Sequence, residues 1–501
     1  MGRGLAALGC AVTAALVALA PAGAGADPPL PEPGGIAPLG SEVQHLHFKY
    51  GPIAIAPGQN LILAGPVTIE KPAYDGYMTS FKPNLVRADG SVPPIEQIHL
   101  HHAVWLNLSR PDATSGGTGG QRFAASGEEK TITRAPSGYG YPIKGSDVWV
   151  LNYMVHNQTP VPDTVWITYD VDYVPANTDL GRTLKPARPI WMDVQNGSAY
   201  PVFDVHRGSG VNGRFTYPDD DPSAPRKNEW TVDQDGTLLG TAGHVHPGGL
   251  YTDLDVLRGA DTRRLFQSDA QYYDPSGPVS WDLSMTATDP DWRVAVRKGD
   301  KLRISATYET QRASWYESMG IMVVWMGPPD GNSPDPFTQP IKTTGAVTHG
   351  HLPEADNHGG EAQPGVADPT TLPDGQTLLN GVAIAGFQYA PGGLGLAGSL
   401  QDPPVVKEGQ SLQFGNFDAP EQAFHTITAC LAPCNRSTGI SYPLADGPID
   451  FDSGELGYGP TGLTAAANRP NWNTPVSLTP GTYTYFCRIH PFMRGAFRVV
   501  K

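Results

Sequence analysis

Apolar and polar side chains alternate with a period of two along most of this chain, and no long stretch has the 3.6-residue period of an amphipathic helix. In one extended segment, a single face would carry Val165, Ile167, Tyr169, Val171 and Tyr173. Gly and Pro number 59 and 50, and they separate runs of aromatic and β-branched residues. This pattern predicts an all-β protein built from β-sandwiches.

The chain has 501 residues, which is more than one hydrophobic core usually supports. Its alternating pattern is interrupted near Pro186 and Pro189, and residues 327–378 are rich in Pro, Gly, Asp and Thr. We therefore expect a first β-sandwich at 40–188, a second at 189–330, a Pro-, Gly- and His-rich linker at 331–377 and a third β-domain at 378–501.

The first 26 residues have the features of a secretory leader. They contain Arg3, an apolar stretch from Leu5 to Ala20, and a cleavage pattern that ends at Ala26. The apolar stretch is too short to span a membrane comfortably, and no other segment approaches that length. We expect a secreted or periplasmic protein without an integral membrane segment in the mature chain.

The net charge is −15 at pH 7, and no cluster of Lys and Arg offers a surface for phosphates. The charge pattern therefore argues against nucleic acid as a partner. An acidic surface would suit solubility or the docking of a basic redox partner.

Three cysteines follow the leader: Cys430, Cys434 and Cys487. An odd number in an oxidising compartment requires a separate role for one of them. The simplest division is a Cys430–Cys434 disulfide, with the thiolate of Cys487 as a metal ligand.

Cys487 belongs to the motif C-x2-H-x2-M, which continues with His490 and Met493 directly after a predicted strand. An upstream histidine, His425, follows another predicted strand. Two imidazoles, a thiolate and a weak axial thioether are the donors of a blue-copper, type 1 electron-transfer site. A buried free cysteine with incidental neighbours is the less favoured interpretation.

These residues resemble the ligands of the plastocyanin and azurin family of cupredoxins, and the short ligand loop resembles that of amicyanin. The resemblance covers nearly all of 378–501 and implies a Greek-key β-sandwich. A long stretch between His425 and Cys487 departs from the family pattern, so the partner is not implied.

Histidines also recur at suggestive positions in the first two predicted domains. They stand at His101-His102, at His156 near the end of a predicted strand, and in the pair His244 and His246 before Pro-Gly-Gly, with Met319 following. The order of these elements resembles that of the copper monooxygenases typified by peptidylglycine α-hydroxylating monooxygenase and dopamine β-hydroxylase.

That resemblance spans about 45–326 and implies two packed, jelly-roll-like β-sandwiches with one copper in each. The first copper would bind His101, His102 and His156, and the second, which activates O2, would bind His244, His246 and Met319. His99 is a rival to His102, and Met322 is a weaker rival to Met319. The chain has no Cys between Cys10 and Cys430, so the disulfides of the animal enzymes are missing.

A further group, His349, His351 and His358 with Glu354, lies in the predicted linker. It would bind another metal or form hydrogen bonds at a domain interface.

Together these features predict a copper oxidoreductase with one type 1 copper and two further mononuclear coppers. Its partners would be O2, a small organic substrate and a redox protein or small reductant. The alternative is a non-catalytic copper-binding electron carrier that serves a separate redox enzyme. Nitrite reductase or laccase chemistry is disfavoured because Cys487 has no neighbouring histidine.

Overall fold

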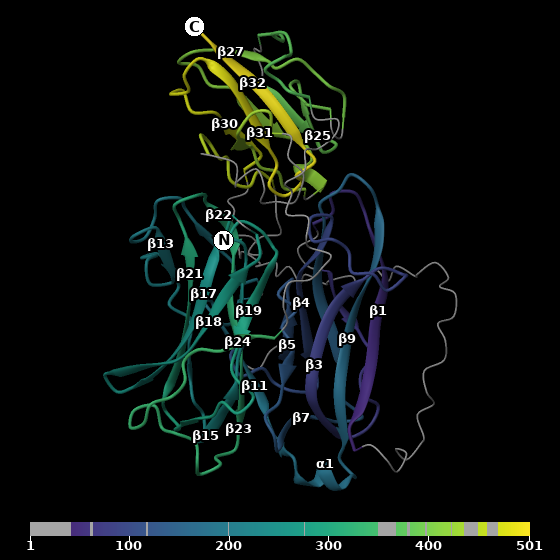
Figure 1. Ribbon diagram of the computed structural model, residues 1–501, viewed down its shortest axis with the longest axis vertical. Coiled ribbons are helices and arrows are strands. Elements are labelled where there is room, and N and C mark those ends of the chain that lie inside the picture. Colours follow the sequence, from purple (N-terminus) through teal and green to yellow (C-terminus); the bar gives the residue numbers. More distant parts are fainter. Residues whose placement is uncertain are drawn as a thin grey trace, which may run out of the picture. The chain divides into compact units, whose positions relative to one another are not determined.

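The computed structural model describes most of the chain after residue 41, and Ser41–Lys501 form one compact unit (Figure 1). The described residues are 42–60, 64–116, 119–198, 200–274, 276–348, 367–377, 381–395, 398–421, 423–434, 449–457 and 469–501. The predicted leader at 1–26 and the histidines at 349, 351 and 358 lie outside these residues.

The described part of the chain is almost entirely β-structure, which confirms the predicted fold class. The exceptions there are the short helix α1 (Asp179–Thr183) and the 3-10 helix η2 (Ala419–Glu421). No helix among these residues has the length and apolar character needed to cross a membrane.

The first group of strands forms a six-stranded sheet, β1-β9-β3-β7-β10 with β6 on β3, and a four-stranded sheet, β2-β8-β4-β5. Its strands are β1 (Gln44–Ile55), β2 (Ala64–Thr68), β3 (Gly76–Val86), β4 (Ile98–Asn107), β5 (Gln121–Ser126), β6 (Thr133–Arg134), β7 (Tyr139–Ile143), β8 (Trp149–Asn157), β9 (Asp163–Pro175) and β10 (Lys185–Pro186). The face predicted on β9 is buried, because Val165, Ile167 and Val171 pack with Phe81 and Trp105 in one core.

The second group contains three sheets: β11-β23-β15-β20 with β16 on β23, β13-β21-β17-β18-β19-β24 with β14 on β21, and the pair β12-β22. Its strands are β11 (Arg188–Asp193), β12 (Phe203–Val205), β13 (Arg214–Tyr217), β14 (Glu229–Thr231), β15 (Gly236–Gly240), β16 (Gly243–Val245), β17 (Gly249–Arg258), β18 (Asp261–Tyr272), β19 (Leu283–Ala287), β20 (Val294–Val296), β21 (Lys301–Glu309), β22 (Trp315–Ser318), β23 (Gly320–Gly327) and β24 (Ala346–Val347). Part of the predicted linker therefore belongs to a sheet, and Phe337 and Ile341 pack against the same core.

The third group forms two four-stranded sheets, β26-β25-β28-β30 and β27-β32-β31-β29. Its strands are β25 (Val382–Ala385), β26 (Gln388–Ala390), β27 (Val405–Lys407), β28 (Gln413–Asn416), β29 (Thr428–Cys430), β30 (Asn471–Asn473), β31 (Gly481–Phe486) and β32 (Arg494–Val500). β25 pairs with β28 in parallel and β27 with β32, while the other pairs are antiparallel. Phe414, Tyr485 and Phe497 are fully buried in the core of this sandwich.

Contacts join the third group to the second. One cluster of buried apolar side chains includes residues of both groups, such as Trp315 and Ile489. The guanidinium of Arg488 donates to the carbonyl of Ser314 at 2.6 Å, and that of Arg207 donates to the carbonyl of Ile449 at 3.0 Å. These contacts place the ligand loop against the second group of strands.

Asp193, at the end of β11, tests the packing between the first and second groups of strands, because it lies 3.6 Å from Arg122 of β5. Burial raises the pKa of its carboxyl to about 6, although Arg122 and the Trp191 indole favour the ionised form. Because this folded-state pKa exceeds the ordinary value of 3.8, the folded chain binds the proton more tightly than the unfolded chain. The contribution of Asp193 to the free energy of unfolding should rise as the pH falls from 7 to 4, by up to about 3 kcal/mol. Asp193→Asn should remove this part of the pH dependence in denaturant titrations, and an unchanged dependence would contradict the burial described here.

Candidate metal centre

The loop between β31 and β32 contains three of the four predicted ligands. Cys487 follows the last residue of β31, and its amide donates to the carbonyl of Met493 at 3.2 Å. The amide of Met493 in turn donates to the carbonyl of His490 at 2.8 Å. These two hydrogen bonds close the loop on itself, so its shape is set by its own backbone.

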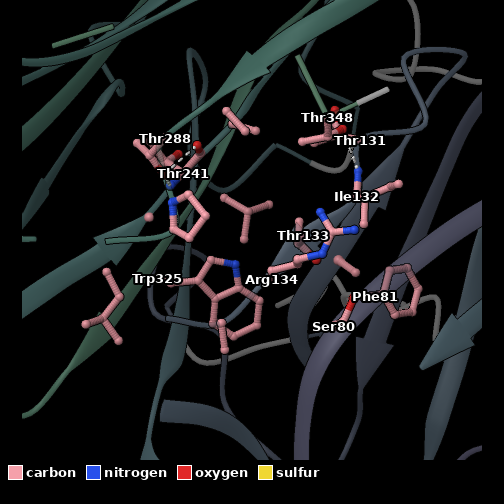
Figure 2. Close-up of a pocket in the computed structure, with 18 of the residues that line it drawn as sticks. Ser80, Phe81, Thr131, Ile132, Thr133, Arg134, Thr241, Thr288, Trp325 and Thr348 are labelled. Atoms are coloured by element: carbon pink, nitrogen blue, oxygen red, sulfur yellow. Dashed lines mark hydrogen bonds between the residues drawn. The ribbon is translucent and has the colours of Figure 1, made fainter. Parts of the chain in front are cut away.

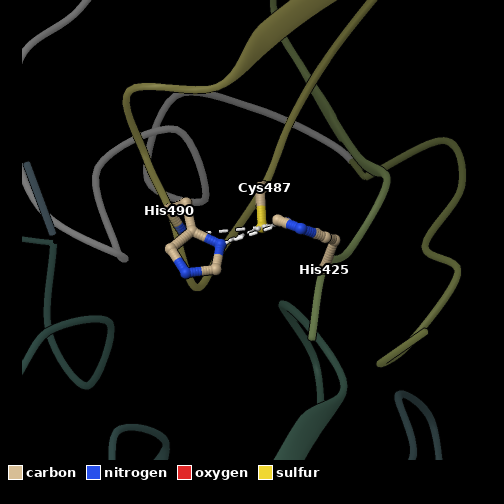
Figure 3. Close-up of side chains that lie close together, drawn as sticks. All are labelled: His425, Cys487 and His490. Carbon is tan, nitrogen blue, oxygen red and sulfur yellow. Dashed lines mark hydrogen bonds between the residues drawn. The ribbon is translucent and has the colours of Figure 1, made fainter. Parts of the chain in front are cut away.

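His425 reaches the same point from another segment, where its backbone pairs with that of Leu456. Its Nδ1 lies 3.1 Å from His490 Nδ1 and 3.9 Å from Cys487 Sγ, and His490 Nδ1 lies 3.6 Å from the same sulfur (Figure 3). All three side chains are fully buried. Among the described residues, this is the one group in which three His, Cys, Asp or Glu ligand atoms lie within 4.8 Å of one another.

Outer contacts orient both imidazoles so that Nδ1 faces the sulfur. The Nε2 atom of His425 lies 3.1 Å from the Asp418 carboxylate, and that of His490 lies 2.7 Å from the carbonyl of Gly58. An imidazole that donates from one nitrogen presents the other, unprotonated, to a metal. The arrangement therefore fixes the tautomer that ligation requires.

The Cys487 thiol is prepared for ionisation. Burial opposes ionisation, but His425 and the amides of Thr426 and His490 hold the pKa of the thiol below its usual value. The two amides lie 3.3 and 3.4 Å from the sulfur. Two imidazole nitrogens and a thiolate are the strong ligands of a type 1 copper, so these side chains fit that metal.

The remaining predicted residues of this part of the chain lie close by. Cys430 and Cys434 are joined in a disulfide, and Cys487 is the free cysteine of the described chain. Met493 is buried at 2% exposure within the ligand loop, and its thioether stays a predicted axial ligand.

The histidines of the first two groups also gather. His99, His101 and His102 lie on β4, His156 on β8, His244 on β16 and His246 directly after it; we call these six residues the histidine cluster. The pairing of β4 with β8 shifts register between Leu100 and His102, so the backbone is irregular at His101. This is the kind of bend that adjacent histidines need in order to face one metal.

The ring contacts group these histidines differently from the two predicted triads. His101 Nδ1 lies 3.3 Å from His102 Nδ1, and the His101 ring centroid is 4.5 Å from that of His246. The ring of His156 instead lies 4.8 Å from His99 and 6.2 Å from His490. The predicted sets, His101 with His102 and His156, and His244 with His246 and Met319, therefore stay predictions.

The structure also shows the surroundings of His99, Met319 and Met322. His99 Nδ1 lies 2.6 Å from the amide nitrogen of Gln158, which occupies that ring nitrogen. Met319 is 3% exposed, and its backbone exchanges hydrogen bonds with the Tyr308 hydroxyl. Met322 is fully buried on β23.

Burial favours the neutral form of several imidazoles in the histidine cluster. Burial lowers the pKa of His102 to about 3 and that of His156 to about 4, and it lowers those of His101 and His246 well below the usual value. Neutral imidazole is the form that binds metals. The buried Nε2 atoms of His244 and His246 have no hydrogen-bond partner among the described residues.

Several residues of these sites were not found from the sequence. The Trp281 ring lies 4.6–4.8 Å from those of His99, His101 and His246, and the Glu129 carboxylate lies 3.1 Å from His244 Nδ1. Gly58 and Asp418 contact the cupredoxin-type ligands. None of the four carries a motif, and each is identified only through a contact in the folded chain.

Comparison with protein-family models finds no match, and neither does comparison with characterised proteins. Among solved structures, the chain is similar to a purple cupredoxin from Nitrosopumilus maritimus, with 17% identity and a TM-score of 0.15, over 25% of this chain and 100% of that one. It is similar to the Cu(I) form of an amicyanin mutant, with 19% identity and a TM-score of 0.13, over 28% of this chain and 95% of that one. A copper-containing nitrite reductase from Thermus scotoductus has 13% identity and a TM-score of 0.17, over 53% of this chain and 55% of that one. The C-terminal part is cupredoxin-like in its two four-stranded sheets and in the buried group of His425, Cys487 and His490.

The Asp418 carboxylate should strengthen metal binding through His425. Asp418→Asn removes the negative charge that stabilises the Nε2–H of the ligand, so copper affinity should fall about 10- to 100-fold. Competition with a chelator measures this affinity. Glu421→Gln, an exposed acid of the same segment, is the matched control, and equal affinities of the two variants would contradict the role given to Asp418.

Proposed function

We propose that this chain is a copper-dependent oxidoreductase in which a type 1 centre on His425, Cys487, His490 and Met493 supplies electrons to the histidine cluster. There, O2 and a small organic substrate would react in a monooxygenase-like hydroxylation. Copper bound by these side chains would supply one-electron redox chemistry at the first site and O2 activation at the second.

The observation that carries the proposal is the position of His490. Its Nδ1 faces the sulfur of Cys487, while its Nε2 reaches the carbonyl of Gly58 in the segment after β1. The His490 ring also lies 6.2 Å from the ring of His156. One imidazole therefore spans the distance between the thiolate and the histidine cluster, which is the geometry expected of an internal electron route.

The outer edge of His490 is covered by the chain itself. The ring is fully buried, and the Phe387 ring packs 4.8 Å from it. Gly58 lies so close that a Cβ there would be 2.6 Å from Phe387 and 3.0 Å from His490. A separate protein could not reach this edge without displacing these residues, so internal transfer is favoured over a carrier role.

The histidine cluster would accept the electrons from the type 1 centre. Its buried imidazoles suit a metal, and the Glu129 carboxylate orients His244. Hydroxylation of a C–H bond by O2 consumes two electrons and two protons from outside the substrate and releases water. An external reductant, either a redox protein or a small molecule, would renew the electrons one at a time.

The alternative is a non-catalytic copper-binding carrier that serves a separate redox enzyme. In that case the histidine cluster would be a structural group of hydrogen-bonded and stacked rings. In both cases, export through the leader predicted at 1–26 would place the chain where the Cys430–Cys434 disulfide persists.

The copper content of the protein distinguishes the oxidoreductase from the non-catalytic carrier. The copper-loaded protein should bind three coppers per chain, one blue and two of type 2 character in electron paramagnetic resonance. Cys487→Ser should lose the blue absorption and one copper but keep the type 2 signals, because its thiolate belongs only to the first site. His47→Ala, at an exposed histidine of β1, should change neither. One blue copper alone would leave the carrier as the function.

The covered edge of His490 gives a kinetic test. Gly58→Val should push Phe387 and His490 apart from the β1 segment, because the added side chain has no room. Electron transfer from the reduced type 1 centre to the histidine cluster, followed after flash reduction, should slow by roughly tenfold or more. Ala56→Val, an exposed position of the same segment, should leave the rate unchanged. Equal rates in both variants would show that the electrons follow another path.

A further inference from the structure

A cavity of about 290 Å³ opens beside His244, between strands of the first and second groups. Its walls come from β3, β5 and β6 on one side and from β16, β19 and β23 on the other. Figure 2 shows side chains from these walls, with Phe81, Ile132 and Trp325 as apolar surfaces and Thr131 and Thr241 among the hydroxyl groups. A cavity of this size has room for about ten groups the size of a water molecule.

Three polar atoms of the cavity walls are buried and have no hydrogen-bond partner in the part of the chain that the structure describes. They are Thr131 Oγ1, Thr241 Oγ1 and His244 Nε2, and their side chains belong to residues that are 5–7% exposed. A buried polar group without a partner is costly, so such groups are normally satisfied by a ligand or by water. The two threonine hydroxyls thus mark positions where a molecule in the cavity would form hydrogen bonds, while His244 Nε2 is the nitrogen left for the proposed metal.

The charged side chains of the walls are engaged or lie at the surface. Glu129 contacts His244, Asp289 pairs with Lys342, and Arg134 is exposed. The interior of the cavity is therefore apolar with scattered hydroxyl groups. Such walls suit an uncharged molecule, because a buried charge would lack a counterion.

We propose that this cavity binds the organic substrate, and that the substrate is a small, uncharged, mainly apolar molecule with one carbonyl or hydroxyl oxygen. The oxygen would form a hydrogen bond with Thr131 or Thr241, which would leave the hydrocarbon part beside His244. This inference rests on the proposed function for its chemistry, but the binding itself requires no copper.

Binding to the copper-free protein tests it with a matched pair of probes. The ketone 1-indanone and the hydrocarbon indane have the same ring system, and only the first carries an oxygen. Ligand-observed nuclear magnetic resonance should show saturable binding of both, with the ketone at least tenfold tighter. Thr131→Val and Thr241→Val together should remove this preference without weakening indane. Thr131→Ser with Thr241→Ser should restore it, because the hydroxyl groups return.

Ala242→Phe, in the cavity wall, should abolish binding of both probes while thermal unfolding stays near that of the parent protein. Absence of saturable binding in the parent would mean that the cavity holds only water, and this would overturn the proposal. Binding that survives both Ala242→Phe and the paired Val variants would overturn it as well. Neither result depends on copper, so a failure here is distinguishable from a failure of the proposed electron route.

Discussion

The antiparallel pairing of β4 with β8 is the constraint on which the arrangement of the histidine cluster depends. It sets His99 opposite His156, and its register shift at His101 lets two adjacent imidazoles bring their Nδ1 atoms within 3.3 Å. A regular strand would send His101 and His102 to opposite faces of the sheet. Because of this irregularity, the imidazoles of two adjacent histidines converge.

In the cupredoxin-like part, two hydrogen bonds orient the imidazole ligands. Each imidazole ligand uses Nε2 for a structural hydrogen bond and leaves Nδ1 for the metal, with Asp418 as the acceptor for His425 and Gly58 for His490. The Gly58 contact has a second consequence, because its carbonyl belongs to the first group of strands. The hydrogen bond from His490 to Gly58 therefore orients the ligand and also links the metal centre to the part of the chain that would receive its electrons.

Burial influences the charge state of the histidine cluster, and Glu129 borders both this cluster and the cavity. Burial lowers the pKa of His101 and His246 well below the usual value, since a charged imidazole at either position would lose its hydration. Glu129 is the carboxylate that contacts this cluster at His244, and it also borders the apolar cavity. Under the proposed function, metal ligation, substrate binding and electron entry would all take place within this region of packed side chains.

The local features of this protein could be predicted from its sequence. Period-two alternation predicted strands such as β9, the motif from Cys487 to Met493 predicted a ligand loop, and the odd cysteine separated Cys487 from the disulfide pair. These features follow from neighbouring residues, whose geometry the strand and the tight loop impose directly. The predicted assignment of six core residues to two triads went further than this local information.

The contacts between residues far apart in the sequence follow from the packing of the sheets. Glu129 contacts His244 across 115 positions, and Gly58 contacts His490 across 432. Such contacts depend on sheet register and on how separate sandwiches pack, and a shift of one residue in a strand would turn each side chain to the other face. The grouping of the histidines, the covered edge of His490 and the cavity beside His244 follow from that packing, so no local pattern in the sequence could have revealed them.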